Sequence, residues 1–157
     1  EILSGLVGSE MCIRDSLIGY ANEYLAKQGV KDIEKHLIVK PFVGNTQAAA
    51  EEKYRSRKKV IGQCGTAIFV FGEMSENSSA TKSGVMEEFE IACEQHKTII
   101  PIAYPGMVSE IIWEKVKGEL TRYPYLEGRI DLLTSVQSPE FLSQIIIHIL
   151  DSVQESM

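Results

Sequence analysis

The sequence predicts a three-layer, Rossmann-like α/β fold in which helices cover a mostly parallel sheet. Two apolar runs, TAIFVFG at 66–72 and TIIPIAY at 98–104, are continuous rather than alternating, as is typical of strands buried on both faces. An amphipathic helical pattern at 84–97 separates them, and its inward-facing residues are expected to be Val85, Phe89, Ile91 and Ala92. Strands that alternate with helices of this length indicate crossover connections, which place neighbouring strands parallel.

The other elements follow from apolar spacing and from the positions of glycine and proline. Residues 17–30 have helical spacing and reach Gly29, where a helix C-cap is expected. The β-branched run at 36–44 is interrupted by Pro41 and therefore indicates a strand followed by a loop. Further along, we expect helices at 46–65, 108–120 and 139–156, a polar loop at 73–83, and a short strand within IDLLTS at 130–135.

The opening segment, EILSGLVGSEMCIRDS, shows neither a helix face nor the alternation of a strand. Its LVGSEMCIRDS part matches one translated reading frame of a common transposase-based sequencing adaptor. We therefore interpret residues 1–16 as an adaptor-derived artefact and exclude them from the functional argument. The natural sequence is then expected to start within a gene at Leu17, so that residues 17–157 form one partial, N-terminally truncated domain.

Charge and cysteine content argue against several classes of function. The chain has a net charge of −6, or −4 when residues 1–16 are left out, because these contain one basic and three acidic residues. An acidic chain is unsuited to non-specific nucleic-acid binding. No apolar run approaches the roughly 18 residues of a membrane-spanning helix. Cys64 and Cys93 lack the spacing of a metal site or a disulfide framework, so we expect reduced thiols, no metal and a cytoplasmic protein.

Two loops are the predicted location of a binding site. Ligands of parallel sheets bind beyond the carboxyl ends of the strands, where loops meet helix N-termini. In this chain those loops are 72–84 and 104–107. Gly72 and Gly84 bracket the first loop, and Gly106 lies in the second. Glycines at such positions either allow a ligand to approach the backbone closely or simply form turns.

Charged side chains near these loops are candidates for ligand contacts. Arg55 and Arg57 lie in the basic stretch KYRSRKK before the first buried strand. The planar fork of a guanidinium suits phosphate oxygens, although a basic run at helical spacing is also typical of a solvated face. Glu88 lies one turn into the helix after the polar loop, at the edge of the buried face. A carboxylate there can accept ribose hydroxyls or attack an anomeric carbon. The helix dipole alone explains its neighbours Glu87 and Glu90.

The stretches IFVFG, GVMEEFEIA and TIIPIAYPG, in this order and spacing, resemble SLOG domains, which are Rossmann-like nucleotide-sensing modules. The resemblance is strongest to the SLOG domain that follows a sirtuin-like NAD-hydrolysing domain in Thoeris anti-phage effectors. It implies a sensor for a cyclic ADP-ribose isomer made by a TIR-domain protein. Binding is implied to rearrange a homotetramer and release the NADase activity of the attached domain. This segment itself then has no catalytic residue and no cofactor.

The resemblance also implies which residues contact the ligand. An arginine in the helix before the central strand matches Arg57, with Arg55 as the alternative, and a glutamate in the following helix matches Glu88. The remaining implied contacts are the three loop glycines, with Lys82 and Tyr104 as further secondary candidates.

This chain departs from the family pattern in two places. Members commonly carry a lysine just after the strand, where this chain has Glu73 and Met74, so we expect a change in ligand identity or affinity. A SLOG domain also begins with a strand, a phosphate-cradling turn, a helix and a second strand. Residues 17–25 resemble the helix after that unit, so we expect the unit and the enzymatic domain to be absent from this chain.

Two other interpretations of the function stay open. The first is an enzyme acting on N-glycosidic bonds, such as a nucleoside deoxyribosyltransferase or a phosphoribohydrolase, in which Glu88 is the nucleophile or the acid/base group. Phosphoribohydrolases carry a compact Pro-Gly-Gly-x-Gly-Thr turn, which GEMSENSSATKSG at 72–84 lacks. The second is a TIR-type interaction module, against which the order of helices and strands argues. A sensor is favoured over both.

Overall fold

The computed structural model describes residues 19, 22–23, 25–32, 47–72, 74 and 83–155. The opening segment 1–16, the expected strand at 36–44 and nearly all of the polar loop at 73–83 lie outside the described residues.

The helix expected at 17–30 ends in the way its glycine predicts. Gly29 adopts a positive φ of 70°, which an L side chain rarely tolerates. The Gly29 N–H donates to the Ala26 carbonyl oxygen at 3.0 Å, and the next N–H donates to the Leu25 carbonyl oxygen at 3.0 Å. This pair of bonds is the Schellman arrangement, so the C-cap prediction is confirmed.

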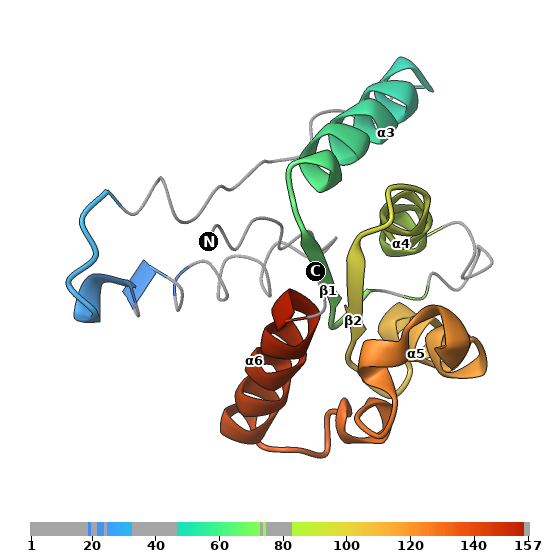
Figure 1. The fold of residues 1–157 in the computed structure, drawn as a ribbon. Coiled ribbons are helices and arrows are strands. Elements are labelled where there is room, and N and C mark those ends of the chain that lie inside the picture. The colour runs from blue at the N-terminus through green and yellow to red at the C-terminus, as the bar shows by residue number, and fades with distance from the viewer. Residues whose placement is uncertain are drawn as a thin grey trace.

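Two parallel strands form the centre of the described fold (Figure 1). Strand β1 (Thr66–Phe69) pairs in parallel with β2 (Thr98–Pro101), with their first residues opposite each other. Helix α4 (Gly84–Glu94) connects them, as the predicted crossover requires. Beyond β2, Ala103 and Thr134 form an isolated parallel bridge, which places a third segment of the chain beside the continuation of β2. The Rossmann-like α/β fold class is therefore confirmed.

Three further helices lie close to their predicted ranges. They are α3 (Gln47–Gly62), α5 (Val108–Gly118) and α6 (Pro139–Glu155). Helix α3 stops before Gly65, where we expected it to end, because the Gly65 carbonyl oxygen already accepts a hydrogen bond from the Thr98 N–H at 3.0 Å. Gly65 thus lies directly before β1, and its carbonyl oxygen bonds to the first residue of β2. Figure 1 shows α4 and α5 on one side of the strand pair and α6 on the other.

The expected strand within residues 130–135 is wrong for most of its length. Ile130–Leu132 forms a 3₁₀ turn, η4, which follows two similar turns, η2 (Leu120–Arg122) and η3 (Pro124–Leu126). The Ile130 carbonyl oxygen accepts hydrogen bonds from the Trp113 indole N–H at 2.9 Å and from the Leu133 N–H at 3.1 Å, so neither lone pair is available to a neighbouring strand. Of these six residues, Thr134 is the one that bridges to the sheet.

The hydrophobic core fills the space between the strands and their flanking helices. The four α4 residues expected to face inward are all buried, namely Val85, Phe89, Ile91 and Ala92. They belong to one apolar cluster with fully buried residues of β2, α5 and α6, including Ile99, Ile112 and Ile149. Burial of this cluster is the main favourable contribution to folding and fixes the position of α4 against the strands.

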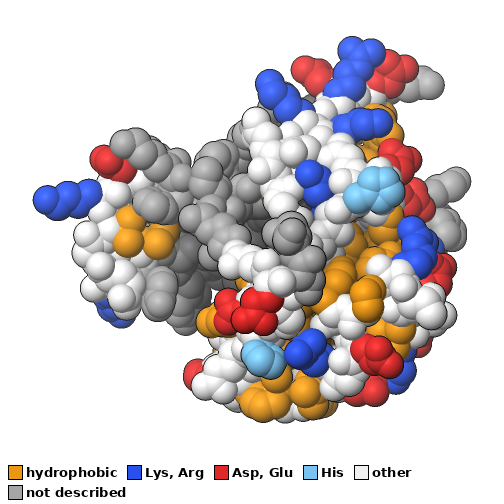
Figure 2. Space-filling view, in the orientation of Figure 1, with side chains coloured by type: hydrophobic (Ala, Val, Ile, Leu, Met, Phe, Trp, Pro, Cys, Tyr) orange, Lys and Arg blue, Asp and Glu red, His pale blue; other side chains and the backbone are white. Residues whose placement is uncertain are grey.

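The surface carries charges of both signs. On the face in Figure 2, Lys and Arg side chains gather with Asp and Glu side chains over the end of the molecule where α3 lies. Cys64 is buried and Cys93 is half-buried, and the Cys64 Sγ lies 3.3 Å from the Val60 carbonyl oxygen. In the part of the chain that the structure describes, no helix is long and apolar enough to cross a membrane.

Candidate functional site

An arginine on α3 and a glutamate on α4 meet in a nearly buried ion pair. The Arg57 Nε donates to the Glu88 Oε1 at 3.0 Å, across 31 positions of sequence. Their side chains are only 15% and 6% exposed. A second guanidinium nitrogen of Arg57 donates to the neighbouring carboxylate of Glu87. One cation therefore joins two consecutive carboxylates of α4 and ties α3 to α4.

The start of α4 places these carboxylates. Ser83 is the N-cap, and its Oγ accepts a hydrogen bond from the Met86 N–H at 3.1 Å, which fixes the first turn. Glu87 and Glu88 follow directly in this turn and the next. Their negative charges lie near the positive end of the helix dipole, which favours carboxylates there.

Gly84 leaves room for the guanidinium of Arg57. A Cβ atom at residue 84 would lie 2.5 Å from the Arg57 Nη2 and 3.3 Å from its Cζ. The guanidinium therefore lies directly against the N-terminus of α4, in space that any larger residue would take. The alternative that Gly84 only forms a turn does not account for this contact.

Gly72 joins three segments at the carboxyl edge of the strands. Its φ is 118°, and a Cβ there would lie 3.0 Å from side-chain atoms of both Val85 and Val108. Its carbonyl oxygen accepts a hydrogen bond from the Val108 N–H at 2.8 Å. The end of β1 is thus packed between the first residues of α4 and α5, and only a glycine fits without strain.

The loop after β2 lies at the same edge. Gly106 has a φ of 76°, and its N–H donates to the Glu110 Oε2 at 2.8 Å. Tyr104 is exposed, with its ring centroid 5.1 Å from that of Phe71, two residues after β1. Space around Gly106 is open, so here the positive φ and not packing favours glycine. The structure thus places the expected loop glycines at one edge, with Gly84 directly against Arg57.

The structure separates the two arginines that the sequence left as alternatives. The Arg55 side chain is 81% exposed, and its one ion pair with a described residue is a loose contact with Glu51 at 3.7 Å on its own helix. Arg57 points the other way, toward α4. Of the remaining candidates, Lys82 and Glu73 lie outside the described residues, and Met74 is exposed.

The electrostatics of the pair are unusual. Burial raises the pKa of Glu88 to about 8, although the charge and hydrogen bond of Arg57 oppose the rise, and the nearby Glu87 charge adds to it. One guanidinium faces two carboxylates, so the cluster has a net negative charge when both are ionised. The buried carboxyl group is the one that holds a proton near neutral pH.

Two features of this region escaped sequence reasoning. Glu87 was assigned to the helix dipole alone, whereas it binds Arg57. In the sequence, its position directly before Glu88 is the one feature that could have indicated a contact with Arg57. The Thr134 bridge brings a third loop beside Ala103, at the same edge, and the buried Thr134 Oγ1 has no hydrogen-bond partner among the described residues.

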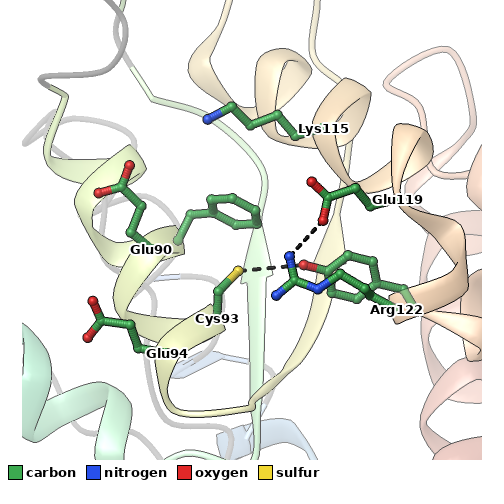
Figure 3. A pocket seen from close by; sticks show the side chains of 8 residues that line it. Glu90, Cys93, Glu94, Lys115, Glu119 and Arg122 are labelled. Carbon is green, nitrogen blue, oxygen red and sulfur yellow. Dashed lines mark hydrogen bonds and ion pairs between the residues drawn. The ribbon is translucent and has the colours of Figure 1, made fainter.

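A separate hollow of about 540 Å³ lies between α4, α5 and η2 (Figure 3). Figure 3 shows Lys115 and Arg122 extending toward α4, with the Cys93 Sγ 3.6 Å from the Tyr123 hydroxyl. Arg122 is paired with Glu119 at 2.6 Å. An adjoining hollow of about 220 Å³ reaches the start of β2, so both lie away from the carboxyl edge. No predicted site residue lines either hollow.

No group of three metal-binding side chains occurs within the described ranges. The polar groups at the carboxyl edge are instead a cation, carboxylates and backbone N–H groups, which can bind phosphate oxygens and hydroxyls.

Fold and site together define a Rossmann-like domain with a polar pair at the carboxyl edge of its strands. The model of the Sir2- and TIR-associating SLOG family (STALD) matches residues 4–153, and this chain belongs to that family. The SLOG resemblance is therefore confirmed. The matched range begins inside the segment 1–16, so the boundary at Leu17 stays a prediction.

Two curated relatives are similar to the chain. It is 26% identical over 122 residues to the NAD(+) hydrolase ThsA of Cytobacillus dafuensis, covering 74% of this chain and 24% of that protein. It is 30% identical over 70 residues to the NAD(+) hydrolase ThsA of Enterococcus faecium, covering 44% of this chain and 15% of that protein. The chain thus spans about a quarter or less of the length of these relatives.

Proposed function

We propose that this chain is the nucleotide-sensing part of a larger NAD-hydrolysing protein of anti-phage defence. In this proposal it binds a cyclic ADP-ribose-type nucleotide and thereby activates a sirtuin-like domain upstream. Membership of the Sir2- and TIR-associating SLOG family supports the pairing with such a domain. Two relatives named as NAD(+) hydrolases support the activity of the whole protein.

The observation that carries the proposal is the Arg57–Glu88 pair against Gly84. A guanidinium binds phosphate oxygens through several directed N–H donors, and a carboxyl oxygen accepts hydrogen bonds from ribose hydroxyls whether or not the group is ionised. The two side chains are 15% and 6% exposed, and their hydrogen bond holds each in place. Groups fixed in this way lose little conformational entropy on binding. The pair therefore supplies complementary contacts for the two polar parts of a nucleotide.

The same geometry disfavours the glycosidic-bond enzyme. A carboxylate nucleophile must be ionised and must reach the anomeric carbon. Glu88 is buried, its Oε1 is bound by Arg57, and burial raises its pKa to about 8. These features suit a binding residue better than a nucleophile.

Further parts of the proposal follow from the resemblance. We propose that a TIR-domain protein makes the nucleotide, that the full protein forms a homotetramer in the cytoplasm, and that no nucleic acid is bound. The acidic net charge of −6 supports the last point.

Calorimetric titration of the full-length protein with cyclic ADP-ribose isomers tests the function, with nucleosides assayed in parallel for release of free base. If the chain is a sensor, at least one isomer should bind saturably to the wild type and no free base should be released. Binding should be abolished or strongly weakened in Glu88→Ala. If no isomer binds and free base is released in a Glu88-dependent way, the chain acts instead as an enzyme on N-glycosidic bonds.

A further inference from the structure

The two carboxylates that bind Arg57 differ in how freely they can leave it. The Glu88 side chain is 6% exposed, whereas the Glu87 side chain is 38% exposed. Withdrawing Glu88 from the guanidinium would leave a polar group in the interior without its partner, which is costly. Glu87 needs only a rotation of its side chain to reach water, because its backbone stays bonded to the Ser83 carbonyl oxygen at 3.1 Å.

The donors that a phosphate requires are therefore partly occupied by the protein itself. Glu88 holds the Nε of Arg57, and Glu87 holds the Nη1. The Nη2 lies against Gly84, at the N-terminus of α4. An anion that approaches this end of α4 meets a guanidinium whose charge is already balanced by a carboxylate at the surface.

We propose that Glu87 sets the affinity and selectivity of the site by acting as an internal anion, which a ligand must displace from Arg57 while Glu88 keeps the guanidinium in place. This inference rests on the proposed function, because it assigns a role within the same site. A ligand then binds by exchanging one anion for another. The exchange favours a diphosphate, with its two negative charges, over a neutral nucleoside that cannot replace the carboxylate.

Other charged contacts keep α3 and α4 together when Glu87 leaves Arg57. The other described ion pair between α3 and α4 joins Lys58 and Glu94 at 3.8 Å, and both side chains are more than half exposed. That pair, together with the Glu88 bond, remains when Glu87 leaves. Displaced Glu87 also stays near the start of α4, where the helix dipole favours its charge.

The test compares Glu87→Gln with Glu90→Gln. Glu90 is an exposed residue of the same helix that makes no ion pair with any described residue, so its substitution removes an equal charge away from Arg57. Binding of cyclic ADP-ribose isomers, inorganic pyrophosphate and adenosine is measured by calorimetry. We expect Glu87→Gln to tighten binding of the bound isomer and of pyrophosphate about fivefold, with less than about twofold change for Glu90→Gln and none for adenosine.

Weaker or unchanged pyrophosphate binding in Glu87→Gln would overturn the inference, because a residue that merely joins two helices or contacts the ligand cannot improve binding when removed. Thermal unfolding shows whether the variant is folded. If it is not, Glu87→Asp gives the same comparison, since the shorter side chain withdraws its carboxylate from Arg57 and should also tighten binding.

The nucleotide-sensing function and the role of Glu87 can be refuted independently of each other. If no isomer binds to wild type or to either variant, the proposed function is wrong, and the pyrophosphate titration still decides the role of Glu87. A gain in pyrophosphate affinity supports that role. The absence of pyrophosphate binding to Glu87→Gln contradicts it.

Discussion

Replacing Glu88 with glutamine is expected to change how the stability of the protein depends on pH. In the folded protein, burial raises the Glu88 pKa from 4.5 to about 8. The folded state therefore holds a proton that the unfolded state has lost between these two values. Stability from this group is fully present below pH 4.5 and is lost as pH rises toward about 8. A glutamine does not titrate, so the variant lacks this loss.

The difference in proton binding between the folded and unfolded states sets the size of this change in unfolding free energy. Within the window, the wild type should lose roughly 1 kcal/mol of unfolding free energy per pH unit through this one group, and a few kcal/mol in all. The opposing attraction of Arg57 is already contained in the raised pKa. Other titrating groups are common to wild type and variant and cancel in the comparison.

Urea unfolding of both proteins at several pH values between 5 and 8 measures the effect. The unfolding free energy of the wild type minus that of Glu88→Gln should fall steadily as pH rises. A difference that stays constant, or that grows with pH, would show that Glu88 is ionised in the folded protein at neutral pH and would refute the electrostatic account of the site.

Three further predictions concern packing and hydrogen bonding. Gly84→Ala places a Cβ 2.5 Å from the Arg57 Nη2, so we expect a stability loss of about 1–3 kcal/mol in thermal unfolding and weakened nucleotide binding. Gly72→Ala combines a φ of 118° with contacts of 3.0 Å to two valines, whereas Gly106→Ala has a φ of 76° and open space. Urea unfolding should therefore show a loss of about 1–2 kcal/mol for Gly106→Ala and a clearly larger one for Gly72→Ala, and equal losses would contradict the packing argument. The Tyr125 hydroxyl accepts from the Ile99 N–H at 2.8 Å and donates to the Ile99 carbonyl oxygen at 3.1 Å, so Tyr125→Phe should cost about 1–3 kcal/mol of unfolding free energy. An unchanged urea midpoint would show that the backbone of β2 does not need this side chain.

The fold was predictable where a local pattern reflected burial. The continuous apolar runs predicted both strands, and the spacing on α4 predicted four of its six buried residues, because burial imposes the same periodicity on sequence and structure. The expected strand at 130–135 failed for the opposite reason. Its backbone is held by the distant Trp113, through a contact that no local pattern records.

The site was predictable in part. Both arginines were visible in KYRSRKK, but residues two positions apart on a helix point in different directions, so the choice depended on which side of α3 meets α4. The bond between Arg57 and Glu87 spans 30 positions and was not predicted. The hollow beside Cys93 also went unpredicted, because three separate elements form it.

The central claim is that Arg57 is the cation that binds the nucleotide, and a matched pair of arginine variants tests it most directly. Arg57→Ala and Arg55→Ala remove the same charge from the same helix, yet their side chains are 15% and 81% exposed. Calorimetry with the cyclic ADP-ribose isomer that binds the wild type should show at least about a tenfold loss of affinity for Arg57→Ala and less than about a twofold change for Arg55→Ala. Equal losses in the two variants, or an unchanged affinity in Arg57→Ala, would contradict the account.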